Sequence, residues 1–168
     1  MEKWLVIFLF LNLSSYGKKT TPNYSFSLKT LDTFYPGVTL ADIKKKYPKT
    51  KIFKKDGGLY KTYVEHSKYK FPVFFKVKKN IVTSFFARLP TFFLHDLFHQ
   101  SLIDRYGKQD RYKKVNKSAL YFWDDEKGIK LTYKGECTIT CFPSYLAGES
   151  SKSGEANGKS ILQEISVF

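Results

Sequence analysis

The chain has 168 residues, of which 42% are hydrophobic and 18% are aromatic, and its formal net charge is +14. So many aromatic residues exclude a disordered chain, because disordered segments contain few of them. The length suits one domain, or two small halves that share a core. Only three of the basic residues are arginines, on which sequence-specific readers of nucleic acid depend, so we expect no sequence-specific nucleic-acid binding.

The excess of lysine has two interpretations. Lysine can be the default surface residue of this composition, or it can form a basic surface for an anionic partner such as a lipid headgroup, an acidic protein or nucleic acid. The lysines cluster at 44–55 and 61–79, and the first cluster opens with Lys44, Lys45 and Lys46. The second interpretation assigns these three lysines to the binding of a protein or an anionic component of the cell envelope.

Residues 1–17 have the pattern of a secretory signal peptide. Lys3 supplies a positive charge, an apolar run follows at 4–13, and Ser15 and Gly17 are the small residues of a cleavage site. The run is shorter than the ~20 apolar residues of a membrane span, and no later stretch reaches that length. We therefore expect a mature protein that starts at Lys18, is periplasmic or secreted, and has no transmembrane span.

The next segments predict an irregular lead-in at 18–36 and a first α+β module at 37–90. Thr39 as N-cap, with Asp42 three residues later, predicts a helix that ends near Tyr47 because Pro48 follows. Alternating residues after the helix predict three strands, at 59–65, 71–78 and 81–89. The last two are expected to form a hairpin.

Residues 91–146 repeat this order and predict a second α+β module. A helix at 92–106 is closed by Gly107, and strands are expected at 119–123, 129–134 and 136–142. The repeat predicts an α+β fold of two sequential helix-plus-antiparallel-meander modules, with the helices packed on one face of the sheet. Residues 147–160 are typical of a flexible linker, and the apolar tail that ends at residue 168 is expected to be loose or an added edge strand.

The sequence does not decide whether the two cysteines, Cys137 and Cys141, are reduced or form a disulfide. An even number of cysteines in a secreted chain indicates a disulfide. A straight strand, however, would place their Cα atoms ~13 Å apart, and a disulfide requires about 4.4–6.8 Å. The segment either folds back to form the bond, or keeps two reduced cysteines on one strand face, or pairs with another chain.

One constellation has catalytic spacing, the pair His95 and His99. Histidines four residues apart on a helix can ligate one zinc ion, and Asp96 stands where the zincin pattern has its glutamate base. A third ligand would have to come from elsewhere, and the candidates are Asp124, Asp125 and Glu136. A zinc-dependent hydrolase is therefore the alternative function, against a pair of structural histidines. With neither a Gly-x-Ser-x-Gly elbow nor a phosphate-binding glycine loop, we expect no cofactor and no enzymatic activity.

Aromatic residues alternate with lysines in the second basic cluster, as stacking surfaces for a ligand can. The same alternation is typical of the face of a half-buried antiparallel sheet. The residues that we assign to a binding site on this basis are Tyr60, Lys61, Tyr63 and Tyr69.

The segment Gly37-Val38-Thr39-Leu40-Ala41-Asp42-Ile43 resembles the helix start Gly-[hydrophobic]-Thr/Ser-x-x-[acidic]-[Val/Ile] of small outer-membrane-assembly lipoproteins. The chain lacks the lipobox cysteine of that family. The order of helix, strands, helix and strands over 37–142 also resembles the β-lactamase-inhibitor-protein group, which is built from two tandem helix–sheet modules and binds enzymes with an aromatic-lined sheet. The resemblance implies a non-enzymatic protein that acts through protein contacts.

Overall fold

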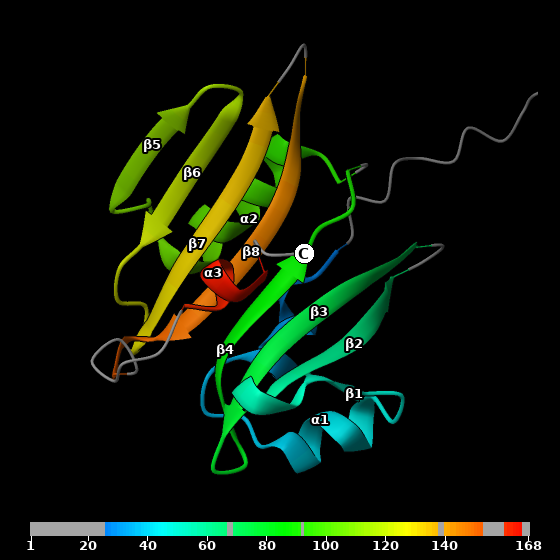
Figure 1. Cartoon of the computed structure of the whole chain (residues 1–168). Coiled ribbons are helices and arrows are strands. Elements are labelled where there is room, and N and C mark those ends of the chain that lie inside the picture. The colour runs from blue at the N-terminus through cyan, green and yellow to red at the C-terminus, as the bar shows by residue number, and fades with distance from the viewer. Residues whose placement is uncertain (1–25, 67–68, 92, 138–139, 153–159, 166–168) are drawn as a thin grey trace, which may run out of the picture.

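The computed structural model describes residues 26–66, 69–91, 93–137, 140–152 and 160–165. Its centre is one eight-stranded antiparallel sheet in which the strands follow the order β1-β2-β3-β4-β8-β7-β6-β5 (Figure 1). The strands are β1 (Lys51–Lys54), β2 (Leu59–His66), β3 (Tyr69–Lys78), β4 (Ile81–Arg88), β5 (Arg111–Val115), β6 (Ser118–Trp123), β7 (Ile129–Cys137) and β8 (Cys141–Ser150). The expected signal peptide at 1–17 lies outside the described residues.

Helix α1 (Leu40–Lys46) begins as the sequence predicts. The Thr39 side chain accepts a hydrogen bond from the backbone N–H of Asp42 at 3.2 Å, which satisfies one of the free donors at the helix start. Ile43 is fully buried and anchors the helix to the core. The lead-in before α1 is more regular than expected, because two 3-10 turns at Leu28–Thr30 and Asp32–Phe34 place Leu28, Leu31 and Phe34 in the same core.

Helix α2 (His95–Tyr106) begins three residues later than the sequence predicts and ends as predicted, with Gly107 next in the chain. Gly107 has a φ of 81°, a backbone conformation that favours glycine. Phe98 and Leu102 are the buried apolar residues of α2, and both belong to the core cluster that contains Ile43 of α1. The two helices therefore cover the same side of the sheet.

Strands β2, β3, β4, β6 and β7 lie close to their predicted positions, but both outer strands were missed. β1 and β5 have only exposed residues, so neither shows the alternation of apolar and polar residues that marks a strand. The two are the edges of the sheet, where lysines such as Lys51 and Lys113 discourage pairing with other chains.

The prediction of a strand at 136–142 is wrong. β7 ends at Cys137 and β8 starts at Cys141, so the segment between the cysteines connects two antiparallel strands. The cysteines lie opposite each other, with their Cα atoms 4.0 Å apart, and form a disulfide. The geometric objection to that bond assumed a straight strand, and the chain reverses its direction instead.

The C-terminal region also differs from its prediction. β8 continues to Ser150, so residues 147–150 belong to the sheet and not to a flexible linker. Gly148 leaves room for the Phe85 ring of β4, because a Cβ atom at this position would lie 2.3 Å from that ring. The described part of the tail is a short helix, α3 (Ile161–Ile165), instead of a loose tail or an edge strand. Residues 153–159 and 166–168 lie outside the described residues.

The sheet separates two apolar clusters. The larger cluster lies under α1 and α2 and contains Phe75, Phe85 and Leu131 from the strands. The smaller cluster lies on the opposite side, where α3 covers it, and includes Phe86 and Ala147. Figure 1 shows α3 in front of the sheet and α2 behind it. We call the side that carries α3 the open face, because α1 and α2 lie on the other side.

The fold is thus mixed α+β and is dominated by its antiparallel sheet. Every strand pair that the structure describes is antiparallel, as the closely spaced strands of the sequence predict. In the described segments of the chain, no helix is both long enough and apolar enough to cross a membrane.

Candidate functional site

The four residues expected to bind on β2 and β3 divide between the two faces of the sheet. Side chains alternate along a strand, so neighbours in sequence point to opposite faces. Tyr60 stacks on Phe75 with ring centroids 5.6 Å apart and packs against the core under the helices. Tyr69 has the same parity as Phe75 on β3. The expectation of a single cluster is therefore wrong.

Lys61 and Tyr63 point to the open face and meet aromatic residues that the sequence analysis missed. The Lys61 ammonium lies 5.6 Å from the ring centroid of Phe53, 5.2 Å from that of Tyr63 and 5.1 Å from that of Phe74. The three rings come from β1, β2 and β3, and Phe53 packs edge-on against Phe74 at 5.1 Å. We name Phe53, Lys61, Tyr63, Lys70 and Phe74 the basic aromatic patch.

The patch combines fixed positive charge with exposed aromatic surface. Tyr63 and Phe53 are 45% and 38% exposed, whereas Lys61 is half-buried between the rings. Lys70 lies 5.5 Å from the Tyr63 ring and pairs with Glu65 at 3.0 Å. The hydrogen bond from Lys70 lowers the pKa of the Glu65 carboxyl, but an exposed pair of this kind contributes little to stability. Such a surface can hold a carboxylate or a phosphate beside apolar groups.

Phe53 and Phe74 were not among the predicted binding residues. Their place in the patch follows from the register of the paired strands, which must be known first. Lys61 lies opposite Phe74 in the β2–β3 pair, and Tyr63 lies opposite Pro72. Phe53 belongs to a strand whose residues are all exposed. The alternation of side chains along β2 predicts that Tyr60 and Lys61 lie on opposite faces of the sheet. It does not predict which residues of the other strands they contact.

The lysine run on α1 lies elsewhere. Lys44, Lys45 and Lys46 occupy the last turn of α1, where positive charge favours the negative end of the helix dipole. All three are exposed, and Lys46 donates a hydrogen bond to the Thr33 hydroxyl at 2.9 Å. Since α1 packs on the side opposite the open face, this run does not gather with Lys61.

The histidine pair on α2 lies under the sheet, among tyrosines. The Nδ1 atom of His95 is 2.9 Å from the Tyr133 hydroxyl, and its Nε2 atom is 3.4 Å from the Tyr121 hydroxyl. The His99 ring lies 4.0 Å from the Tyr121 ring. Burial lowers the pKa of both imidazoles, so their neutral forms are favoured.

This arrangement does not match a zinc site. Both nitrogens of His95 face hydroxyl groups, and the rings of His95 and His99 stack with centroids 5.8 Å apart. Within the described ranges, no group of three His, Cys, Asp or Glu side chains comes together. The pair instead has the surroundings of structural histidines.

The residues considered as a third ligand are engaged in other contacts. Asp124 pairs with Arg111, which lowers the pKa of the Asp124 carboxyl. Asp125 accepts hydrogen bonds from the Gly128 backbone and from a serine hydroxyl. Glu136 accepts a hydrogen bond from Lys134 at 2.9 Å. Each of them stabilises a turn or a strand end.

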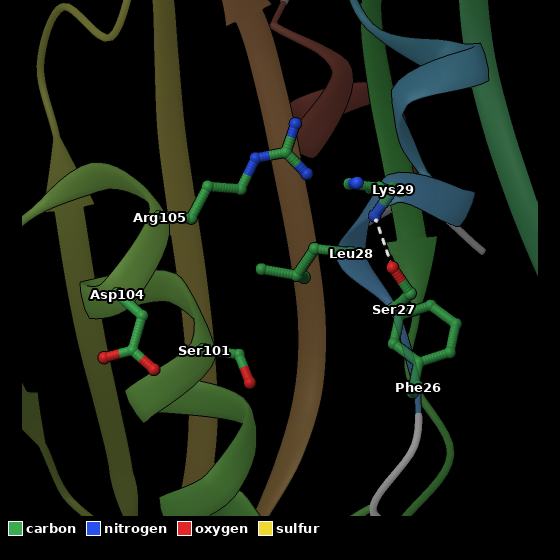
Figure 2. Close-up of a pocket in the computed structure, with 7 residues that line it drawn as sticks. All are labelled: Phe26, Ser27, Leu28, Lys29, Ser101, Asp104 and Arg105. Atoms are coloured by element: carbon green, nitrogen blue, oxygen red, sulfur yellow. Dashed lines mark hydrogen bonds between the residues drawn. The ribbon is translucent and has the colours of Figure 1, made fainter.

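An open groove of about 440 Å³ lies between α2 and the first 3-10 turn. Figure 2 shows Ser101, Asp104 and Arg105 of α2 facing Leu28 and Lys29 across it. Arg105 also pairs with Asp32 at 2.8 Å and therefore fixes the lead-in to α2. The groove is lined by one carboxylate, Asp104, and by two cationic side chains, Lys29 and Arg105.

The chain was compared with protein-family models, curated proteins and solved structures. No protein family, curated protein or solved structure matches it.

Proposed function

We propose that this chain is a non-enzymatic binding protein, periplasmic or secreted, that holds a protein or an anionic component of the cell envelope on its basic aromatic patch. One observation carries the proposal. The Lys61 ammonium lies within 5.6 Å of three ring centroids, on the sheet face that α1 and α2 leave open.

The geometry of Lys61 supports binding because its side chain already contacts three rings in the free protein. A lysine that is mobile in the free protein loses rotamer freedom when it meets a partner, and that loss weakens binding. The contacts of Lys61 with Phe53, Tyr63 and Phe74 reduce this loss. Aromatic side chains of this kind dominate the binding energy of protein interfaces.

The charge of the chain supports an anionic partner. A formal net charge of +14 steers anions toward the protein, and this effect weakens as salt screens charges beyond ~8 Å at physiological ionic strength. The patch adds a specific contact point to that general attraction, because a carboxylate near Lys61 or Lys70 also contacts an aromatic ring.

We also propose that the fold consists of two sequential helix-plus-meander modules, as the resemblance to the inhibitor group implies. α1 precedes β1–β4 and α2 precedes β5–β8, and the two sets meet where β4 pairs with β8. The inward order of strands from each edge supports this division, although α3 and the dominance of the sheet depart from a simple duplication.

An extracytoplasmic location belongs to the same proposal. A disulfide such as Cys137–Cys141 forms and persists in oxidising compartments, which agrees with the signal-peptide pattern. N-terminal sequencing of protein recovered from the host tests the location, because cleavage should leave Lys18 as the first residue. A mature chain that retains Met1 would contradict it.

Capture from envelope extract tests the binding site. Immobilised protein with Lys61→Glu or Tyr63→Ala should lose most of the partner that wild type retains, while Lys113→Glu on the exposed edge strand β5 should retain it. Equal capture by all four proteins would contradict the proposed site. Metal analysis of untagged protein tests the hydrolase alternative, since stoichiometric zinc lost on His99→Ala would replace our proposal with that one.

A further inference from the structure

Helix α3 is bound to the open face by apolar contacts. Ile161 is fully buried in the smaller cluster with Leu59, Phe86 and Ala147. Leu162 and Ile165 are partly buried and pack against that cluster, as Phe74 and Tyr145 also do. Three apolar residues at positions i, i+1 and i+4 therefore form one side of a short amphipathic helix that lies on the sheet.

Polar contacts fix the same helix in place. Glu164 pairs with Lys76 of β3 at 2.8 Å, and both side chains are mostly buried, at 13% and 20% exposure. The Ile161 backbone N–H donates to the Glu149 carboxylate at 2.9 Å. Ser160 and Gln163 exchange hydrogen bonds between side chain and backbone, which is the pattern of a capping box.

A five-residue helix has little stability of its own, because isolated helices shorter than ~12–15 residues are marginal in water. The surface on which α3 lies therefore supplies most of its stability. That surface accepts a helix with apolar residues on one side and a carboxylate placed to meet Lys76.

The α3 surface and the basic aromatic patch are continuous through one residue. Phe74 packs at the border of the cluster under α3 and also lies beneath the Lys61 ammonium. Lys76 and Phe74 are two positions apart on β3 and point to the same face. A helix longer than α3 could pair one carboxylate with Lys76 and a second with Lys61.

We propose that the open face binds an amphipathic helix of a partner protein that carries acidic residues, and that α3, with its single carboxylate Glu164, occupies part of the same surface until the partner displaces it. The inference rests on the proposed binding function and names the chemistry of its partner. A partner helix that reaches the patch gains contacts that α3 does not make, so it can replace α3. Because α3 covers the surface, the apparent affinity equals the intrinsic affinity multiplied by the fraction of protein whose surface is open.

The test uses a fluorescent synthetic peptide with the sequence of residues 158–168 and the full-length mature protein. Ile161→Asp in the protein should release α3 and raise the affinity for the peptide at least ~10-fold over wild type. Ile81→Asp is the matched control, because it makes the same substitution at a 44% exposed position near α1, and it should bind the peptide as wild type does. Lys76→Glu added to Ile161→Asp should reverse the gain.

Equal peptide affinity for wild type and Ile161→Asp, or binding that Lys76→Glu does not weaken, would overturn the proposal. If Ile161→Asp fails to fold, Glu164→Lys releases the helix through charge repulsion with Lys76 and replaces it in the same comparison. The capture experiment distinguishes this result from failure of the proposed function. Capture that depends on Lys61 but is not competed by the peptide would refute only the acidic helix as ligand.

Discussion

The Nδ1 atom of His95 on α2 lies 2.9 Å from the hydroxyl oxygen of Tyr133 on β7, and both side chains are buried. This contact fixes the first turn of α2 to the centre of the second set of strands. Gly135, two positions along β7, makes room for the histidine, because a Cβ atom there would lie 2.5 Å from the Cε1 and Nδ1 atoms of the His95 ring. Helix and strand can approach closely only with glycine at that position.

Gly135→Ala should therefore lower the free energy of unfolding by about 1–3 kcal/mol, the usual range for an overpacked site. The new methyl group would push the His95 ring away from Tyr133. Urea denaturation at neutral pH measures the change. Gly57→Ala is the control, since its Cβ would meet the Glu164 carboxylate at an ordinary distance of 3.5 Å. Equal destabilisation by both variants would contradict the role of Gly135.

Stability should fall as the pH drops below ~6.5, the ordinary pKa of histidine. Burial lowers the pKa of His95 and His99 in the folded protein, so the unfolded chain takes up protons that the folded chain excludes. The free energy of unfolding is then highest above the unfolded pKa and decreases as the pH falls toward the lower folded values. Urea denaturation at pH 7.5, 6.5 and 5.5 measures this decrease.

The double variant His95→Gln with His99→Gln serves as the control for this pH dependence. It removes both imidazoles, so its slope of stability against pH in this range should be nearly flat even if its stability at pH 7.5 is lower. The carboxyls with lowered pKa values, Glu65, Asp124 and Glu136, titrate at more acidic pH and do not interfere. If the double variant kept the wild-type slope, the two histidines would not be the cause of the pH dependence of stability.

Loss of the disulfide should cost about 2 kcal/mol of unfolding free energy, from the entropy of closing so short a loop. The paired variant Cys137→Ser with Cys141→Ser removes the bond, and thermal denaturation compares it with oxidised wild type. Wild type treated with a reducing agent should behave like the variant. If the reducing agent changed the melting temperature of the variant as well, its effect could not be assigned to this bond.

Reversal of lysine charge separates a specific basic surface from general attraction. Changing Lys61 and Lys70 of the basic aromatic patch to Glu should weaken binding to vesicles with anionic phospholipid more than the same change at Lys113 and Lys114 of β5. Both variants alter the net charge equally, so a difference in their vesicle binding reflects where on the surface the lysines lie. Binding of wild type should also fall steeply with added salt. Equal losses of vesicle binding in both variants, or wild-type binding insensitive to salt, would show that these lysines belong to an ordinary solvated surface.

The sequence predicted the fold best where the determining contacts are local. The start of α1 follows from Thr39 and Asp42, which are three residues apart, and Gly107 follows the last residue of α2. The reversal at the cysteines remained one alternative beside a straight strand, because strand propensity does not show where a chain reverses. The helix α3 was missed because its apolar side packs against residues far away in the sequence, such as Phe86.

The site was predicted in part for a related reason. Lys61 and Tyr63 were named from alternating residues, and alternation also places them on one face. Phe53 and Phe74 join them only through the pairing of β1, β2 and β3, which a single sequence does not specify. Tyr60 was grouped with them by proximity in sequence, whereas the pleat of β2 sends it into the core.

The pairing of β4 with β8 determines when the chain can complete its fold. Each set of four strands is a meander of neighbours, but this junction joins Ser84 to Glu149, and such distant contacts form late because loop closure must come first. Until β8 arrives, β4 has an unpaired edge that includes the apolar Phe85, Phe86 and Ala87. Such an edge is a template for aggregation, so a chain truncated between the two sets would keep it permanently.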